Sequence, residues 1–296
     1  METIRKARNG DVEIAYERFG KPGGEPLVLV GGLDGQMVWY DEDFLCRALA
    51  DRGFDVVRYD NRDAGLSTHF GPGSRPAYSA RAFIDDLVAL QDELGWSSAH
   101  LFGLSMGGGI AQLTALLHPD RVRALITMGA LPMRKNLFVA SVRHMRFPGP
   151  FRHAFKRFGD SRDEQIRMLV HVTRMAAAPG RYDEEWGAKR AAESYDRRPP
   201  DPHARQRQLF ARRFDLPPGG ISGIKAPTLA LHGELDPLVR ASAVRAIAEQ
   251  IPGARWELLP GVGHAPGVAE DWGLLVDRID RHVKAVEQGG RARSCG

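Results

Sequence analysis

Cysteine is scarce in this chain of 296 residues, which contains only Cys46 and Cys295. Cys46 lies in an amphipathic helical pattern and Cys295 lies in a polar tail, so the two are poor candidates for a structural disulfide. This usage favours a reducing, cytoplasmic setting. No cysteine or histidine spacing typical of a metal site occurs, and we expect neither a metal ion nor a cofactor.

Long apolar runs are missing as well. No stretch reaches the roughly 18 consecutive apolar residues that a transmembrane helix needs. The N-terminus, Met1–Lys6, lacks the apolar core of a signal peptide. We therefore expect no membrane partner. With 43% hydrophobic residues, the chain can nevertheless bury a substantial core.

Acidic residues are few in one segment. Residues 134–213 contain 19 Lys and Arg but only 9 Asp and Glu, whereas the whole chain carries a net charge of only +4. A basic segment can indicate nucleic-acid binding, but these arginines are scattered at helical spacing and no recognised nucleic-acid module surrounds them. We interpret them as a solvated helical face and expect no nucleic-acid partner. An alternative is that some of them attract an anionic or carbonyl-rich substrate.

Strand and helix patterns alternate on both sides of one insertion, which predicts the α/β class with a single doubly wound, mostly parallel sheet. The run Leu27–Val30 is wholly apolar, as in a parallel strand that is buried on both faces. The expected strands are residues 11–19, 27–30, 54–59, 99–102, 124–128, 228–232 and 255–259, and the expected helices are 41–52, 79–94, 110–117, 240–250 and 270–287.

The insertion has a different character, because from Leu131-Pro132 to about Gly220 no clear strand pattern appears. Proline and glycine breaks divide this segment into roughly four helices. It is rich in aromatic and methionine side chains, and we expect about a third of them to contact a substrate. We predict a first core part at 1–132, an inserted helical cap at 133–220, a second core part at 221–288 and a disordered tail at 289–296.

The stretch Gly103-Leu104-Ser105-Met106-Gly107 has the form G-x-S-x-G, with an apolar strand-like run before it and an apolar, helix-permissive run after it. This is the context of a nucleophile elbow, in which a strained turn lifts the serine hydroxyl above the sheet. Ser105 is therefore the candidate nucleophile. The alternative is a glycine-rich turn with an incidental serine.

A serine hydroxyl needs a base within hydrogen-bond reach and a carboxylate that orients this base. Asp236 and His264 follow the last two predicted strands, at the sheet edge where Ser105 lies. The chain order of serine, aspartate and histidine is the one that this type of elbow uses. Glu234 competes with Asp236 for the acid, although we expect it to be solvated. His232 belongs to a strand end, and we expect it to point into the core.

Two backbone donors are needed for the tetrahedral intermediate. We expect one from Met106, the residue after the nucleophile, and the other from Gly32 or Leu33 in the loop after the first apolar strand. The spacing leaves Gly32 and Leu33 as alternatives.

Other acidic residues are given structural roles. The loop Asp60–Ser67 is interpreted as a segment whose Asp and Arg side chains tie it to the neighbouring backbone. Asp85 and Asp86 lie in a predicted helix, where we expect surface or capping residues.

With these residues in place, the core of the chain resembles the α/β-hydrolase family. The resemblance rests on Gly103–Gly107, on His232-Gly233-Glu234-Leu235-Asp236-Pro237, on Gly261-Val262-Gly263-His264 and on Tyr59–Ser67. The last segment is similar to the family's D-x-R-G-x-G-x-S loop, with Asp63 in place of its first glycine. The aclacinomycin methylesterases and related esterases show a similar loop, and the pair Gly31-Gly32, where the family commonly has His-Gly, also resembles them. These enzymes demethylate a carbomethoxy group on a polyketide glycoside.

These observations lead us to expect a cofactor-independent serine hydrolase of secondary metabolism that acts on a carboxylic ester of a bulky, apolar small molecule. The same triad could instead cleave a lactone, a thioester or a C–C bond, or close a ring during biosynthesis. A small-molecule receptor without catalysis is a third reading, because a fold does not fix a function. We expect a monomer or a homodimer.

Overall fold

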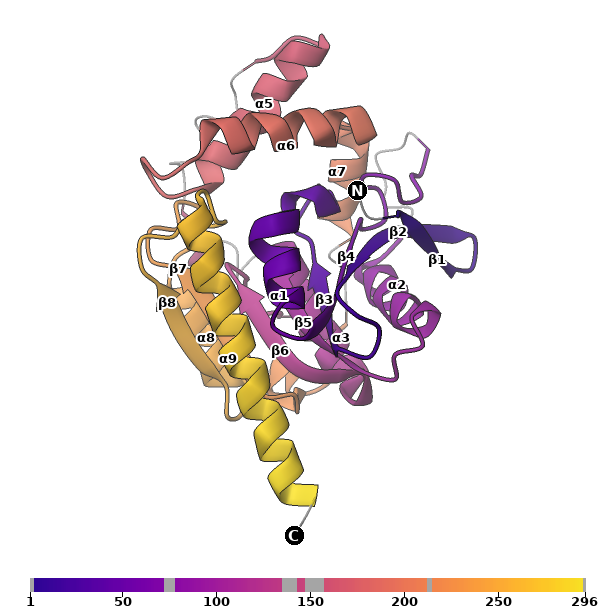
Figure 1. The fold of residues 1–296 in the computed structure, drawn as a ribbon, viewed down its shortest axis with the longest axis vertical. Helices are drawn as coiled ribbons and strands as arrows, with labels where there is room; N and C mark the ends of the chain where they lie inside the picture. The colour runs from indigo at the N-terminus through magenta and orange to yellow at the C-terminus, as the bar shows by residue number, and fades with distance from the viewer. Residues whose placement is uncertain (1–2, 72–77, 135–142, 147–156, 212–214, 295–296) are drawn as a thin grey trace.

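The computed structural model describes residues 3–71, 78–134, 143–146, 157–211 and 215–294. An eight-stranded sheet forms its centre, in the order β1-β2-β4-β3-β5-β6-β7-β8 (Figure 1). The parallel strands are β3 (Glu25–Val30), β4 (Phe54–Tyr59), β5 (Ala99–Leu104), β6 (Val122–Met128), β7 (Thr228–Gly233) and β8 (Arg255–Leu259). The predicted mostly parallel α/β sheet is confirmed.

Two antiparallel strands, β1 (Arg5–Asn9) and β2 (Val12–Phe19), extend the sheet at one edge. The sequence analysis does not predict β1, because Ala7 is its only apolar residue and no alternation is visible. Ala7 is fully buried, and the pairing of β1 with β2 satisfies the backbone groups on the outer side of β2.

Helices cover both faces of the sheet. The helices α2 (Ala80–Glu93), α3 (Met106–Leu117) and α8 (Ser242–Gln250) pack on the face that receives Val28 and Val30. The short helix α1 (Ala48–Ala50) and the long helix α9 (Ala269–Ser294) pack on the face that receives Leu27 and Leu29. Successive side chains of β3 thus point to opposite cores, and each buried side chain of this kind stabilises the fold by roughly 1.5–3 kcal/mol.

Among the described residues, the segment between β6 and β7 contains the α-helices α5 (Arg162–Ala176), α6 (Glu184–Arg197) and α7 (Pro202–Phe210), followed by the short 3-10 helix η5 (Gly220–Gly223). The α-helices lie beyond one end of the sheet (Figure 1). The side chains of Ser161, Asp183 and Asp201 accept hydrogen bonds from the first turns of these helices, which explains where each helix begins. The first of the four predicted cap helices lies mostly outside the described residues, and the cap boundaries stay a prediction.

Helix α9 is longer than the sequence analysis expects. It continues to Ser294, whereas residues 289–296 are predicted as a disordered tail, and residues 295–296 lie outside the described residues. Gly289 and Gly290 each weaken a helix by about 1 kcal/mol relative to alanine. Good helix formers surround them, however, and a helix that has already begun propagates at little cost.

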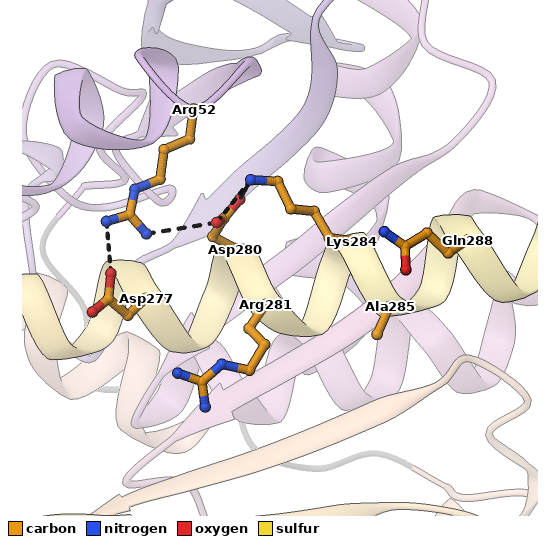
Figure 2. A pocket seen from close by; sticks show the side chains of 7 residues that line it. All are labelled: Arg52, Asp277, Asp280, Arg281, Lys284, Ala285 and Gln288. Atoms are coloured by element: carbon orange, nitrogen blue, oxygen red, sulfur yellow. Dashed lines mark hydrogen bonds and ion pairs between the residues drawn. The ribbon is translucent and has the colours of Figure 1, made fainter.

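A surface hollow runs along α9 beside α1 (Figure 2). Arg52 forms ion pairs with Asp277 (2.6 Å) and Asp280 (3.6 Å), and Lys284 lies 2.9 Å from Asp280. Because these charges neutralise one another, the hollow is a solvated helix flank.

In the part of the chain that the structure describes, every helix is too short or too polar to span a bilayer.

Candidate active site

Ser105 occupies the turn between β5 and α3 with a strained backbone conformation at positive φ (φ 55°, ψ −117°). Its N–H donates to Met128 O at 2.8 Å, which fixes the turn to the end of β6. A Cβ at Gly107 would overlap the carbonyl oxygen of Val30, and one at Gly103 would overlap the backbone of Gly107. Only glycine fits at these two positions, and the predicted strand–turn–helix context of Ser105 is present.

Asp236 and His264 are brought together, as the sequence analysis predicts. His264 Nδ1 lies 2.8 Å from Asp236 Oδ2, and the other carboxylate oxygen accepts the N–H groups of Leu238 (2.7 Å) and Val239 (2.8 Å). Burial alone would raise the pKa of the Asp236 carboxyl, but the charge of His264 and its hydrogen bond lower this pKa below its ordinary value. Asp236 therefore stays ionised and can orient the imidazole.

The ring of His264 lies at the carboxyl end of β6. A Cβ on Gly129 would come within 2.9 Å of the ring atoms Cε1 and Nδ1, and Gly129 directly follows Met128, the residue that binds the Ser105 N–H. The two residues thus approach the same strand end. The hydrogen bonds of the described residues do not include one between Ser105 Oγ and His264, and the complete triad stays a prediction.

The expected oxyanion donors also converge on Ser105. Met106 is the first residue of α3, where backbone N–H groups are free to bind a negative charge. A Cβ on Gly32 would lie 3.6 Å from Ser105 Cβ, which places this loop beside the nucleophile. Leu33 follows in the same turn. Gly32 and Leu33 both stay predicted donors.

The two other candidates near the acid, His232 and Glu234, lie where the sequence predicts. His232 is 1% exposed, its Nε2 lies 3.2 Å from Val239 O, and it lies 3.7 Å from Asp236 Oδ2. Burial lowers the pKa of His232, so this histidine is held neutral behind the acid. Glu234 is exposed and accepts the N–H of Gly261 at 3.1 Å. Asp236, and not Glu234, therefore faces the histidine.

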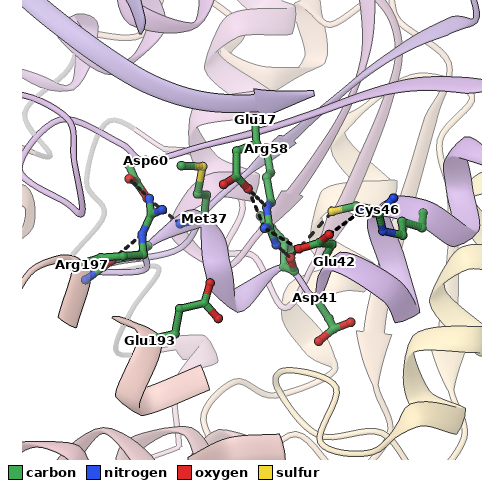
Figure 3. A network of polar contacts seen from close by, with 12 residues as sticks. Glu17, Met37, Asp41, Glu42, Cys46, Arg58, Asp60, Glu193 and Arg197 are labelled. Carbon is green, nitrogen blue, oxygen red and sulfur yellow. Dashed lines mark hydrogen bonds and ion pairs between the residues drawn. The ribbon is translucent and has the colours of Figure 1, made fainter. Parts of the chain in front are cut away.

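The loop after β4 contacts the cap helices as well as the neighbouring backbone. Asp60 accepts the N–H of Met37 and, at 2.7 Å, a guanidinium N–H of Arg197 from α6 (Figure 3). Asp63 receives two bonds of 2.8 Å from Arg207 of α7. Burial raises the pKa of Asp60 in spite of Arg197. At Asp63 the effect of burial is outweighed by the bonds from Arg207 and Tyr78, which lower its pKa.

Two expectations are corrected by these contacts. Arg207 is 1% exposed and the Arg197 side chain only 11%, so these two members of the basic segment do not belong to a solvated face. Asp86, expected to be a surface or capping residue, is 1% exposed and pairs with Arg62 at 2.6 Å. The sequence gives little sign of these pairs, because their members are far apart along the chain. The side chain of Asp85 is 42% exposed and pairs with Arg81.

A second buried network lies beside this loop (Figure 3). Arg58 donates to Glu17 at 2.8 Å and to Tyr40 O, and its side chain is 2% exposed. Burial raises the pKa of the neighbouring Cys46 thiol to about 12. Cys46 is therefore a packing residue and not a nucleophile.

One group among the described residues has ligand atoms close enough for a metal ion: Glu25, His100 and Glu287. Arg123 also pairs with both carboxylates of this group, so part of their charge is already compensated. Glu25 and His100 lie at the amino ends of β3 and β5. This is the opposite edge of the sheet from Ser105, and the cluster is not part of the candidate active site.

Comparison with known proteins agrees with this geometry. A family model described as the alpha/beta hydrolase fold matches residues 25–269. The chain belongs to this family. Within the alpha/beta hydrolases, the rhodomycin D methylesterase DnrP of Streptomyces peucetius is 29% identical, covering 88% of this chain and 92% of that protein. A Caulobacter protein named as a carbamate hydrolase, RutD, is 28% identical, covering 87% and 91%.

Solved structures of alpha/beta hydrolases show the same fold. A Burkholderia cenocepacia protein described as an aryl esterase superposes with a TM-score of 0.76 at 20% identity, covering 97% of this chain and all of that one. The comparisons confirm the predicted family and support the prediction of a hydrolase. The roles of the individual site residues stay predictions.

Proposed function

We propose that this alpha/beta hydrolase is a serine esterase that cleaves a carboxylic ester, such as a methyl ester, of a bulky apolar small molecule. The observation that carries the proposal is the convergence of the strained Ser105 turn with the Asp236–His264 pair at one edge of the sheet. A Ser-Asp-His arrangement of this kind activates a hydroxyl group that is otherwise a poor nucleophile.

In the proposed reaction, Ser105 Oγ attacks the ester carbonyl while His264 Nε2 takes its proton. The negative oxygen of the tetrahedral intermediate accepts the N–H of Met106 and that of Gly32 or Leu33. His264 then returns the proton to the leaving alcohol as the C–O bond breaks and an acyl-enzyme forms. Water repeats the same steps, releases the acid and restores Ser105. Asp236, whose two oxygens are both hydrogen-bonded, stabilises the imidazolium throughout.

The substrate class is proposed from the relatives and from the cap. The relative DnrP is named a rhodomycin D methylesterase and matches this chain over most of its length, which supports a methyl ester. The cap helices lie beyond the end of the sheet where Ser105 lies, and Ala176 O at the end of α5 accepts the His264 N–H at 2.7 Å. A bulky acyl group would therefore be held between cap and core. The similarity to RutD makes a carbamate the second candidate.

Intact-protein mass spectrometry after treatment with a fluorophosphonate probe tests the proposal. We expect a single adduct on the wild-type protein and none on Ser105→Ala. A panel of methyl esters, carbamates, thioesters and lactones then identifies the bond that is cleaved. Wild-type protein without an adduct, and without activity on the panel, would contradict a serine esterase and favour a non-catalytic receptor.

A further inference from the structure

The loop Gly31–Gln36, here called the oxyanion loop, is tied to the cap at two points. The N–H of Asp34 donates to Gln208 Oε1 of α7 at 2.9 Å. The side-chain amide of Gln36 donates to Ser194 O (2.8 Å) and Arg198 O (3.0 Å) at the end of α6. The loop that is expected to supply an oxyanion donor therefore takes part of its shape from the cap.

The side chain of Gln208 is fixed by hydrogen bonds at both of its amide atoms. It is 1% exposed, and its Nε2 donates to Arg62 O at 2.8 Å while its Oε1 receives the Asp34 N–H. The preceding residue, Arg207, pairs with Asp63 and donates to Gly71 O. Both the amide and the helix that carries it are thus held against the core.

The bond to Gln208 holds Asp34 in an unusual backbone conformation. Its φ of 56° lies in the left-handed region, which a residue other than glycine adopts at a cost unless its surroundings hold it there. Without Gln208 the Asp34 N–H loses its partner, and relaxation toward a common backbone conformation would move the preceding residues. Gly32 lies only two residues away, beside Ser105.

We propose that Gln208 is a positioning residue that holds the oxyanion loop in its catalytic shape, so that the docked cap completes the oxyanion hole. This inference rests on the proposed function, because it presumes that a backbone N–H of Gly32 or Leu33 binds the oxyanion. Gln208 acts through Asp34 and does not touch the substrate.

The test compares wild type with Gln208→Met, which keeps the length of the side chain and removes both hydrogen bonds. The substrate is phenyl acetate, which is too small to depend on the cap for binding. We expect kcat to fall about 10- to 100-fold while KM changes less than about threefold, as for a displaced oxyanion donor. A trifluoromethyl ketone, whose adduct with the serine places an anion in the oxyanion hole, should bind more weakly by a similar factor.

Two further variants keep the test decisive. Gln165→Met changes a glutamine of α5 whose amide donates to Gly159 O within the cap, and it should leave both constants unchanged. Gln208→Asn, which is one methylene too short to span both partners, replaces Gln208→Met if thermal unfolding shows that the latter does not fold. It should lower kcat in the same way.

The outcomes separate this inference from the proposed function. Wild-type protein that shows neither esterase activity nor labelling of Ser105 would contradict the proposed function itself. An active wild type whose folded Gln208 variants keep full kcat and full affinity for the ketone would overturn only the role of Gln208. A rise in KM for bulky esters alone would also overturn it, because Gln208 would then act on substrate binding.

Discussion

Both carboxylate oxygens of Asp236 have hydrogen-bond partners. One carboxylate oxygen binds His264, and the other accepts two backbone N–H groups of the turn that follows it. These bonds offset the cost of burying an ionised group at 2% exposure. The carboxylate is thereby fixed in position and in charge before any substrate arrives.

Replacing Asp236 with asparagine should lower kcat by about 10⁴ while KM stays nearly constant, because the amide no longer stabilises the imidazolium or selects its tautomer. The matched control is Glu234→Gln, two residues earlier, where the exposed side chain only accepts the N–H of Gly261. Initial-rate kinetics on the same ester measure both. Equal losses in the two variants would contradict the assignment of Asp236 as the acid.

A second prediction at this scale concerns His282, which is 4% exposed and whose Nε2 lies 3.2 Å from Pro227 O. Burial lowers the pKa of His282 below its ordinary value of 6.5. As the pH falls below this value, the unfolded chain binds a proton that the folded protein resists. Stability is therefore lost between about pH 7 and the lower folded pKa.

The urea midpoint at pH 7 and pH 5 measures this effect. His282→Gln cannot titrate but can still donate to Pro227 O, so its midpoint should fall less over this interval than that of wild type. The control is His203→Gln, which changes an exposed histidine at the start of α7. If His282→Gln and wild type lose the same stability, the buried histidine is not a source of acid sensitivity.

At the scale of elements, an ion pair connects the cap helix α7 to the loop after β4. The pair formed by Arg207 of α7 and Asp63 is nearly inaccessible to water, with side chains 1% and 0% exposed. The pair formed by Arg162 and Asp196 within the cap has side chains that are 49% and 55% exposed. The two pairs have similar geometry, yet removing one partner leaves a buried charge only in the first.

Arg207→Met should therefore lower the free energy of unfolding by about 3–5 kcal/mol, as is typical when a buried pair loses one member. Arg162→Met should change it by less than about 1 kcal/mol. Urea unfolding, followed by circular dichroism, gives both values. A small loss in Arg207→Met would show that water or a shifted side chain replaces the guanidinium and that the pair does not fix the cap.

The sequence predicts the elements better than their contacts. Strands such as β4 and β8 coincide with their predicted ranges, because apolar runs and turn residues are local signals. The sheet edge that gathers Asp236 and His264 also follows from strand order. The contacts of Gln208 and Arg207 with the core loops do not, because no local pattern links side chains more than a hundred residues apart.

For the whole molecule, part of the basic excess of the cap is taken up by acidic residues of the core. Among the described residues of the cap, ion pairs involve Arg162, Arg167, Arg174, Arg181, Arg190, Arg197 and Arg207, of which Arg181, Arg197 and Arg207 pair with acidic residues of the core. Paired guanidinium groups do not form the continuous positive stripe that a phosphate backbone binds. This arrangement favours a small-molecule substrate over a nucleic acid.

Chromatography on DNA–cellulose tests this expectation. The protein should pass through at about 0.1 M salt, and lowering the salt further should cause at most weak retention. A cytochrome c sample of known positive charge serves as the positive control for retention. Strong, salt-dependent retention of the hydrolase would contradict our reading of the basic segment.

The place of the cap in the chain has a further consequence for the order of folding. β6 and β7 are neighbours in the sheet, yet the entire cap separates them along the chain, so their pairing must close a long loop. Ser105 lies before that loop, whereas Asp236 and His264 lie after it. Secondary structure can thus return early during refolding, while a nucleophile with its base exists only after the last strands have joined the sheet.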